Sequence, residues 1–215
     1  MSEVAVRRAV WSDLPYLYEI CLKTGDQGKD ATALFSDPYL VGHYYAAPYL
    51  LYQNGICFVA EHECRPQGYI VAVPDTVAFG QWLEESWLPP LRKRYGQPHP
   101  ESRTEKDKWI VDLIHKRHYP ADAADRPWLA EYPAHLHVDL LPSLQGKGLG
   151  RTLMDRLFSE LANLDVPGLH LGVGSSNAGA VGFYQKVGFS VIEEHDWGFT
   201  FGKACGRNRK TSGEC

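Results

Sequence analysis

The sequence predicts an α+β fold in which a mixed central sheet is flanked by helices on both faces. Strand-like and helix-like stretches alternate along the chain instead of falling into separate halves. With 215 residues, of which 44% are apolar and 12% aromatic, the chain is long enough to bury a substantial core. We expect a single domain over residues 1–202 and a polar, disordered tail over residues 203–215.

The first part of the chain predicts a strand, two helices and a hairpin. Alternating Val4-Ala-Val-Arg-Arg-Ala is typical of a strand, and Ser12-Asp13 predicts the cap of a helix that ends near Leu22. A second helix is expected over residues 37–52, with a break or kink at Pro48. The hairpin strands are expected at residues 56–61 and 68–73, with a longer loop at residues 63–67 between them.

A helical insert is expected over residues 74–133. Helical patterns at 76–95 and 104–118 are separated by the proline-bearing turn 96–100, and Pro89-Pro90 should interrupt the first helix. The insert is rich in tryptophan, so it either packs a small core of its own or covers a binding site. The tryptophans are Trp82, Trp87, Trp109 and Trp128.

The last part of the chain is built around a glycine-rich loop. A strand over 135–141 leads into Gln145-Gly-Lys-Gly-Leu-Gly150, and apolar residues at helical spacing predict a helix over 151–163. The remaining elements are a strand at 168–173, a helix at 177–187, and strands at 189–193 and 197–201.

The glycine-rich loop is predicted to bind an anion. Its three alternate glycines allow a tight turn that brings successive N–H groups close to one ligand, and the positive end of the following helix favours a diphosphate there. Neither G-x-x-x-x-G-K-[ST] nor G-x-G-x-x-G can be read across these residues. Loops of the nucleoside triphosphate and dinucleotide types are therefore excluded.

A second segment narrows the kind of ligand that the loop is expected to bind. It is Asn177-Ala-Gly-Ala-Val-Gly-Phe-Tyr-Gln-Lys-Val-Gly-Phe189. The loop fits Q/R-x-x-G-x-G/A at Gln145, Gly148 and Gly150, and the second segment fits N-x-x-A-x-x-x-Y-x-x-x-G-F. Together they resemble the acetyl-coenzyme A (acetyl-CoA) signature of the GCN5-related N-acetyltransferase (GNAT) superfamily, over roughly residues 134–202. The resemblance implies a GNAT-like sheet, with the helical insert before the coenzyme-binding strand, and transfer of an acetyl group from acetyl-CoA to an amine by direct attack.

Three further features resemble bacterial relatives of the acetyltransferase-like C-terminal domain of eukaryotic O-GlcNAcase. They are Asp26-Gln-Gly28, Trp87-Leu-Pro-Pro90, and Tyr132-Pro133 leading into Val138-Asp-Leu140. The coenzyme loop is intact in this chain, so the narrower resemblance does not imply inactivity.

The family resemblance also implies which residues hold the coenzyme. Backbone groups around Leu140 and Leu141 would pair with the pantetheine arm, and an amide there would act as an oxyanion site. Asn177 is expected to cap its helix as well as to bind coenzyme, whereas the charges of Lys147 and Arg151 either meet the phosphates or are solvated. The whole cofactor-binding set is Leu140, Leu141, Gln145, Gly146, Lys147, Gly148, Leu149, Gly150, Arg151, Asn177, Ala180 and Tyr184.

Amine acetylation needs a base, because removing a proton from an alkyl ammonium of pKa about 10.4 costs about 4–5 kcal/mol at pH 7. Period-2 alternation places His135, His137 and Asp139 on one face of the predicted strand. In the catalytic interpretation, Asp139 or His137 takes the proton, directly or through water, and His135 is the weaker candidate. In the alternative interpretation, this face is only hydrogen-bonded to the covering helices.

Tyr184 aligns with the tyrosine that protonates the departing thiolate in many family members. Full proton transfer from a phenol to a thiolate is uphill by ~2 kcal/mol, so the resemblance is better expressed as a stabilising hydrogen bond. The alternative is an aromatic side chain that only packs between helix and sheet.

Composition limits the partners. A net charge of −4 provides no field that attracts nucleic acid or an anionic membrane. An odd number of cysteines, five, without a C-x-x-C pair favours a reducing cytoplasm, and we expect a soluble protein because no leader or long apolar run is present. The spacings His115-x-x-His118 and His135-x-His137 lack a third ligand, so no metal is expected.

The amine acceptor remains open between a small molecule and a protein. The rival interpretation is a non-catalytic module that binds acetyl-CoA or a partner protein on the same fold, since fold alone does not establish activity.

Overall fold

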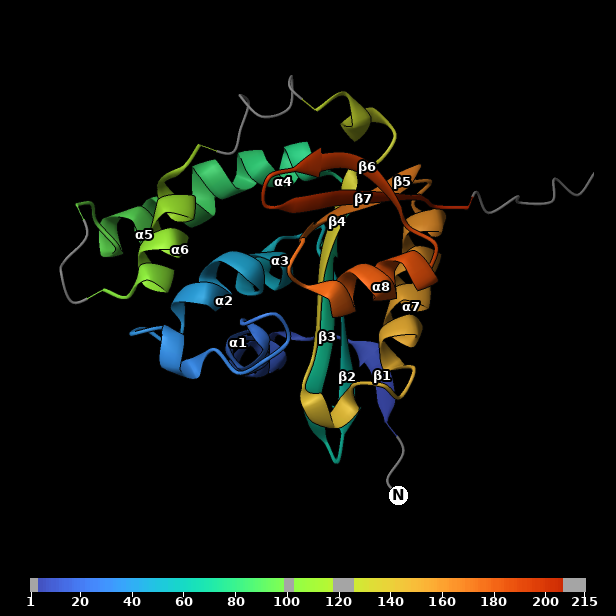
Figure 1. Ribbon diagram of the computed structural model, residues 1–215, viewed down its shortest axis with the longest axis horizontal. Coiled ribbons are helices and arrows are strands. Elements are labelled where there is room, and N and C mark those ends of the chain that lie inside the picture. The colour runs from blue at the N-terminus through green and yellow to red at the C-terminus, as the bar shows by residue number, and fades with distance from the viewer. Residues whose placement is uncertain (1–3, 99–102, 118–125, 207–215) are drawn as a thin grey trace, which may run out of the picture.

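The computed structural model describes residues 4–98, 103–117 and 126–206, and it contains one seven-stranded sheet of order β1-β2-β3-β4-β5-β7-β6 (Figure 1). Only the β4–β5 pair is parallel. The predicted mixed sheet with helices on both faces is confirmed. The strands are β1 (Ala5–Arg8), β2 (Ile56–His62), β3 (Arg65–Val73), β4 (Ala134–Leu140), β5 (Gly168–Gly174), β6 (Ser190–His195) and β7 (Gly198–Ala204). The α-helices are α1 (Leu14–Thr24), α2 (Leu40–Tyr45), α3 (Ala47–Leu51), α4 (Thr76–Trp82), α5 (Leu88–Arg94), α6 (Glu105–His115), α7 (Leu149–Asn163) and α8 (Ala178–Lys186).

Side-chain alternation on the central strands produces two apolar cores, one on each face of the sheet. Tyr69, Val71 and Val73 of β3 pack with α1–α6, whereas Ile70 and Ala72 pack with α7 and α8. Figure 1 shows the two helical layers on opposite sides of β2, β3 and β4.

The insert shares its core with the N-terminal helices. Phe79 of α4, Leu88 of α5, and Ile110 and Ile114 of α6 lie in the same buried cluster as the apolar residues of α1–α3. The prediction that the insert packs a separate small core is therefore wrong, and α4–α6 complete one helical layer of the molecule.

Two local predictions at the start of the chain need correction. Asp13 makes no side-chain cap to α1, because its carboxylate accepts hydrogen bonds from Arg7 at 2.7 and 2.9 Å. The hairpin loop is only Glu63-Cys64, and the strands continue to His62 and Arg65. Both loop residues have positive φ, 52° and 59°, as in the two-residue turns whose twist matches that of paired strands.

The prolines act in different ways. Pro48 lies in the first turn of α3, directly after the predicted break between α2 and α3. Pro89 and Pro90 do not break the α4–α5 helix. A π-helical turn, η3 (Leu83–Trp87), carries the helix into α5, whose first turn contains both prolines. Proline has no N–H to donate, and the wider π-helical turn lets the chain pass both prolines without ending the helix.

The end of the chain is ordered further than predicted, because β7 continues to Ala204 and the described residues reach 206. The rest of the predicted tail, together with Pro100 and His118, lies outside the described residues. Among the helices that the structure describes, none is both long and apolar enough to cross a bilayer.

Candidate active site

A gap opens in the sheet between β4 and β5. The two strands pair only at Ala134↔Leu169 and His135↔His170, and they diverge beyond these pairs. The N–H of Leu141 donates to Gln67 O at 2.9 Å on the β3 side. Because backbone groups point to alternate sides along a strand, the N–H and C=O groups of Val138 and Leu140 face the gap.

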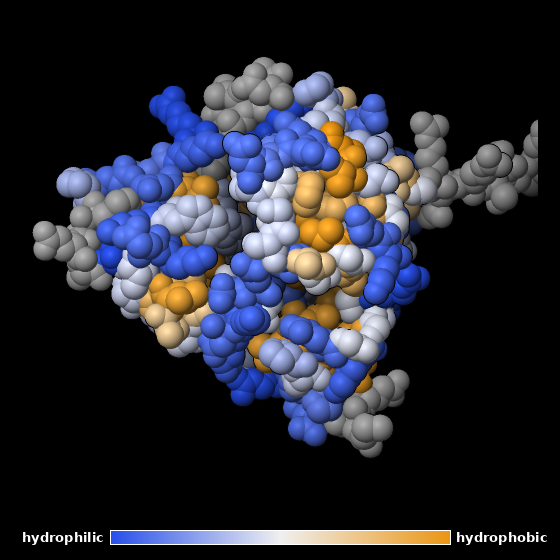
Figure 2. All heavy atoms as spheres, in the orientation of Figure 1, coloured by the Kyte–Doolittle hydropathy of each residue, from blue (hydrophilic) through white to orange (hydrophobic). Residues whose placement is uncertain are grey.

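A cavity of about 940 Å³ passes through this gap. On one side it is bounded by the glycine-rich loop, the start of α7, and α8; on the other side it is bounded by α1, the loop after α1, α2 and α6. Figure 2 shows the surface hollowed in the middle of this face, between the insert side and α8.

The glycine-rich loop forms the end of the cavity that suits an anion. Gly146 and Gly148 have φ of 71° and 80°, a left-handed conformation that favours glycine, and Gly148 is the N-cap of the 15-residue helix α7. The first N–H groups of α7 have no intrahelical acceptor, and the helix dipole is positive there. Gln145 fixes the loop to β4, because its Nε2 donates to Leu140 O at 2.8 Å. The loop thus combines a left-handed turn with a helix N-terminus, an arrangement that suits a diphosphate.

The neighbouring positions of the predicted coenzyme set differ in their contacts. Arg151 lines the cavity and donates to Lys186 O at 3.3 Å. Lys147 is exposed and is not among the residues that line the cavity. Leu149 packs against the apolar core under α7, and a Cβ at Gly150 would lie 3.1 Å from the ring of Phe183.

Leu141 corrects the sequence-based assignment of the strand end. Its N–H donates to Gln67 O, and its carbonyl accepts from the N–H of Leu144 at 2.8 Å, so both backbone groups are already engaged. Val138 takes its place as the second β4 residue with backbone groups in the gap. No sequence signal marks Val138, because its exposure depends on where β4 and β5 separate.

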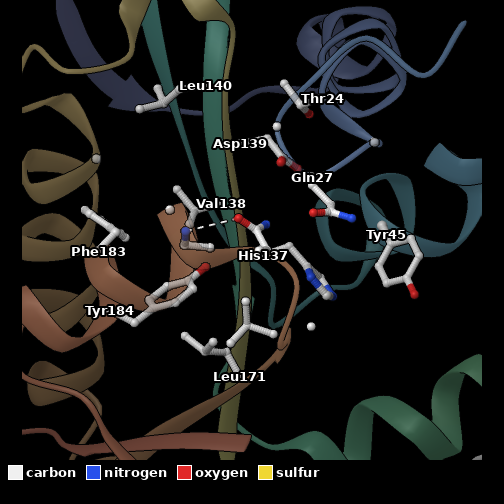
Figure 3. Close-up of a pocket in the computed structure, with 18 of the residues that line it drawn as sticks. Thr24, Gln27, Tyr45, His137, Val138, Asp139, Leu140, Leu171, Phe183 and Tyr184 are labelled. Atoms are coloured by element: carbon white, nitrogen blue, oxygen red, sulfur yellow. Dashed lines mark hydrogen bonds between the residues drawn. The ribbon is translucent and has the colours of Figure 1, made fainter. Parts of the chain in front are cut away.

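Several residues of the Asn177–Phe189 segment line the α8 wall of the gap, among them Asn177, Ala180 and Tyr184. The predicted cap is confirmed, since Asn177 Oδ1 accepts from Ala180 N–H at 3.1 Å. The Tyr184 side chain is 8% exposed, its hydroxyl points into the gap (Figure 3), and no hydrogen bond to it is found within the described residues. Burial first, and then Asp139, raise the pKa of Tyr184, so the phenol keeps its proton at neutral pH.

The polar face of β4 lies on the opposite side of the strand. Figure 3 shows His137 and Asp139 directed toward Tyr45, Gln27 and Thr24, away from Val138 and Leu140. Asp139 Oδ2 accepts from the Tyr69 hydroxyl at 2.5 Å. Burial raises the pKa of Asp139 above its usual range, against the smaller lowering effects of Tyr69 and Thr24.

His135 and His137 have different surroundings. Thr76 Oγ1 donates to Pro133 O, so it accepts from His135 Nδ1 at 2.7 Å, and His135 Nε2 then accepts from the Tyr49 hydroxyl at 2.8 Å. His135 is thus fully bonded within the protein. His137 has ring contacts and no hydrogen bond within the described residues, and burial lowers its pKa to about 4, so it is a neutral imidazole.

A second cavity of about 430 Å³ lies beside the first one, and Tyr45, His137 and Gly172 line both. Rings dominate its walls. The lining residues are Tyr44, Tyr45, Tyr49, Thr76, Phe79, Gly80, Leu83, Arg126, Trp128, His135, His137, His170, Gly172, Glu193, His195, Trp197 and Thr200.

Several cavity residues lie far from the sequence motifs. Thr24 and Gln27 come from the end of α1 and the loop after it, and Tyr45 comes from α2. Gln27 and Gly28 both have positive φ, 54° and 86°. Asp26-Gln-Gly28 supports the narrower family resemblance and is also the signal by which this wall of the cavity could have been found.

The metal-like spacing His115-x-x-His118 extends beyond the described residues at His118. Groups of three or more His, Cys, Asp or Glu side chains with suitable geometry are absent from the described part of the chain. His115 Nε2 is hydrogen-bonded to Tyr95 O at 2.8 Å.

The protonation state of His170, which lines the second cavity, can be tested through the pH dependence of stability. It is 7% exposed, and burial lowers its pKa to about 4, whereas the unfolded value is about 6.5. Between these values the unfolded chain binds a proton that the folded chain does not, so stability falls as the pH is lowered. At pH 5 the loss from His170 is about 2 kcal/mol.

The expected result is a smaller decrease in the free energy of unfolding between pH 7.5 and 5 for His170→Gln than for the unmodified protein, measured by urea denaturation. His62→Gln, in the β2–β3 hairpin and outside both cavities, is the control. Parallel pH dependences for His170→Gln and the unmodified protein would show that His170 is not held neutral.

The comparisons with known proteins define the class. The model of the Acetyltransferase (GNAT) family matches residues 28–189, and the chain therefore belongs to the GNAT family. Among solved structures, SsHAT is 31% identical, with a TM-score of 0.84 over 95% of this chain and 100% of that chain. The structure of yncA from Salmonella typhimurium with its cofactor acetyl-CoA shares the fold at 18% identity and a TM-score of 0.54, covering 96% of each chain.

Curated relatives match over a shorter length. The [ribosomal protein bS18]-alanine N-acetyltransferase of Escherichia coli (strain K12) is 43% identical over 49 residues, which cover 23% of this chain and 33% of that protein. The peptidyl-lysine N-acetyltransferase YjaB of Salmonella typhimurium is 41% identical over 58 residues, which cover 26% and 37%. The chain thus spans about a third of the length of the curated relatives it matches.

Proposed function

We propose that the protein is an acetyl-CoA-dependent N-acetyltransferase that binds acetyl-CoA and an amine together in the β4–β5 gap. The observation that carries the proposal is that backbone groups of Val138 and Leu140 face the gap. The glycine-rich loop lies on one side of these groups, and the polar face of β4 lies on the other. Close positioning of the two substrates allows direct attack, without an acylated enzyme intermediate.

The cradle suits the diphosphate of coenzyme A, with the N-terminus of α7 and the left-handed loop as the donors. The backbone groups of Val138 and the N–H of Leu140 pair with the amide groups of the pantetheine arm as a neighbouring strand would, while Leu140 O accepts from Gln145 Nε2. A backbone N–H in this position also stabilises the negative charge that develops on the acetyl oxygen.

Different side chains around the gap take the proton of the amine and stabilise the leaving thiolate. Asp139 takes the proton that the ammonium loses, directly or through water, because burial raises the pKa of its carboxyl group toward the working range. His137 is a neutral hydrogen-bond partner for the amine. The amine nitrogen attacks the acetyl carbonyl, the C–S bond breaks, and the Tyr184 hydroxyl stabilises the leaving thiolate by donating a hydrogen bond.

The direct test combines calorimetric titration of acetyl-CoA with an assay of thiol release over a panel of amines and peptides. Binding with turnover of at least one acceptor is expected. Absence of binding heat would refute the coenzyme site, whereas binding without turnover over a broad panel would favour a non-catalytic acetyl-CoA-binding module.

Tyr184→Phe should lower kcat about 10–100-fold and leave the dissociation constant of acetyl-CoA unchanged, because the variant loses one hydrogen bond to a charged group. The phenyl ring still fills the space among Phe183, Phe189 and Phe201. Tyr16→Phe, in α1 and outside both cavities, is the matched control. An unchanged kcat in Tyr184→Phe would assign Tyr184 to packing alone.

A further inference from the structure

We propose that the second cavity binds the body of the acceptor, and that the acceptor is a small-molecule primary amine carried on a flat aromatic body. The proposal rests on the acetyltransferase function above and names the substrate class of the same site.

The position of the second cavity is the first argument. Tyr45, His137 and Gly172 line both cavities, so the two volumes lie next to each other beside the β4–β5 gap. An amine that reaches the acetyl group past these residues has the rest of its molecule in the second cavity. His137 lies on that path, because it lines both cavities.

The walls of the second cavity favour ring systems. Six of the lining side chains are Tyr, Phe or Trp, and four more are imidazoles. Trp197 is 57% exposed in the short connection between β6 and β7, and its ring stacks on His195 with centroids 4.7 Å apart and planes 6° apart. A Cβ at Gly172 would lie 3.1 Å from Cη2 of this indole, so the glycine lets Trp197 lie against β5 at the cavity. An exposed indole in this position offers a flat surface on which an aromatic ligand stacks.

The charges of the second cavity exclude a highly charged acceptor. Glu193 and Arg126 are its only carboxylate and guanidinium among the described lining residues. Glu193 Oε2 already accepts from Trp128 Nε1 at 2.7 Å. His170 donates from Nδ1 to Tyr132 O at 2.7 Å, and burial keeps His135, His137 and His170 neutral by lowering their pKa values. A polyamine or a polyanion would need many charges of one sign, which these walls do not supply.

The volume separates a small molecule from a polypeptide side chain. About 430 Å³ falls within the range of roughly 300–1,000 Å³ that small-molecule pockets occupy. This volume is several times that of one lysine side chain, so a lysine would leave most of the ring-lined space unfilled. Apolar walls with a few polar groups are the usual environment of a small aromatic ligand.

The experiment measures kcat/KM for each acceptor at saturating acetyl-CoA. The probes are 2-phenylethylamine and tryptamine, compared with n-butylamine, spermidine, a lysine-containing peptide and a peptide with a free N-terminal alanine. The two aromatic amines should exceed every other probe by about tenfold or more, since ring stacking adds to the burial of apolar area. A peptide as the best acceptor would overturn the small-molecule assignment and leave the acetyltransferase function standing.

Trp197→Ala tests the cavity itself. The variant should raise KM for 2-phenylethylamine about tenfold without changing the affinity for acetyl-CoA, whereas Trp11→Ala should change neither. Trp11 is a suitable control because it is 77% exposed and lies outside both cavities. Unchanged KM in Trp197→Ala would overturn the assignment of the second cavity.

A binding measurement that does not require turnover keeps this test separate from the test of the proposed function. Calorimetry of 2-phenylethylamine with coenzyme A present should give saturable binding that Trp197→Ala weakens and Trp11→Ala does not. Absence of binding overturns the inference whether or not the protein acetylates any amine. Binding together with an absence of thiol release would instead count against the proposed function.

Discussion

Replacing Gly148 by valine is expected to weaken acetyl-CoA binding by about 100-fold or more while the fold is retained, which corresponds to about 2.7 kcal/mol. Gly148 has φ of 80°, a conformation that costs a residue with a Cβ about 1–2 kcal/mol. A Cβ at Gly148 would have no protein atom within 4 Å, so the added Cβ itself causes no clash inside the folded chain. The branched side chain would instead stand in the space over the N-terminus of α7, where the diphosphate is expected.

Gly96→Val is the matched control for Gly148→Val. A Cβ at Gly96 also has open space, its φ is outside the left-handed region, and it lies outside both cavities. Calorimetric titration should show normal acetyl-CoA affinity for Gly96→Val and lost affinity for Gly148→Val, with similar circular dichroism spectra. Tight binding by a folded Gly148→Val protein would contradict the cradle.

Local sequence signals predicted the backbone geometry of the glycine-rich loop and of the Asn177 cap. The tight turn at Gly146–Gly148, the N-cap at Asn177 and the start of α7 each depend on neighbours within a few residues, so the printed sequence contains the reason for each. The alternation of His137 and Asp139 with Val138 and Leu140 was predictable for the same reason, because strand periodicity is local.

The rest of the site depends on contacts between distant segments. The gap exists because β5 leaves β4 after two residue pairs, and no pattern within β4 records that separation. For the same reason the engagement of Leu141 by Gln67 and Leu144 was missed. The second cavity combines α2–α4 with the β6–β7 hairpin, which lie more than a hundred residues apart in the chain. Composition identified the tryptophan-rich insert, but only the tertiary structure shows which indoles line a cavity.

Asp139→Asn is expected to lower kcat about 10²–10³-fold without loss of stability. The amide oxygen can accept from the Tyr69 hydroxyl as the carboxylate does. The amide N–H₂ group is suited to Thr24, because the Thr24 hydroxyl already donates to Ile20 O at 2.7 Å and has lone pairs left to accept. Only the ability to take a proton is removed, and general-base catalysis contributes roughly this factor.

The sign of the stability change in Asp139→Asn separates a catalytic role of Asp139 from a structural one. Burial raises the pKa of this carboxyl group because the charged form is desolvated, so a neutral amide should keep or increase the free energy of unfolding at pH 7.5. Activity of the unmodified protein should fall as the pH drops below the raised pKa, since the base is then protonated, and this dependence should be absent from the residual activity of Asp139→Asn. Asp155→Asn, exposed on α7, is the control. If Asp139→Asn loses stability and activity together, the carboxylate serves to hold β4 against α1, and the proton leaves by another route.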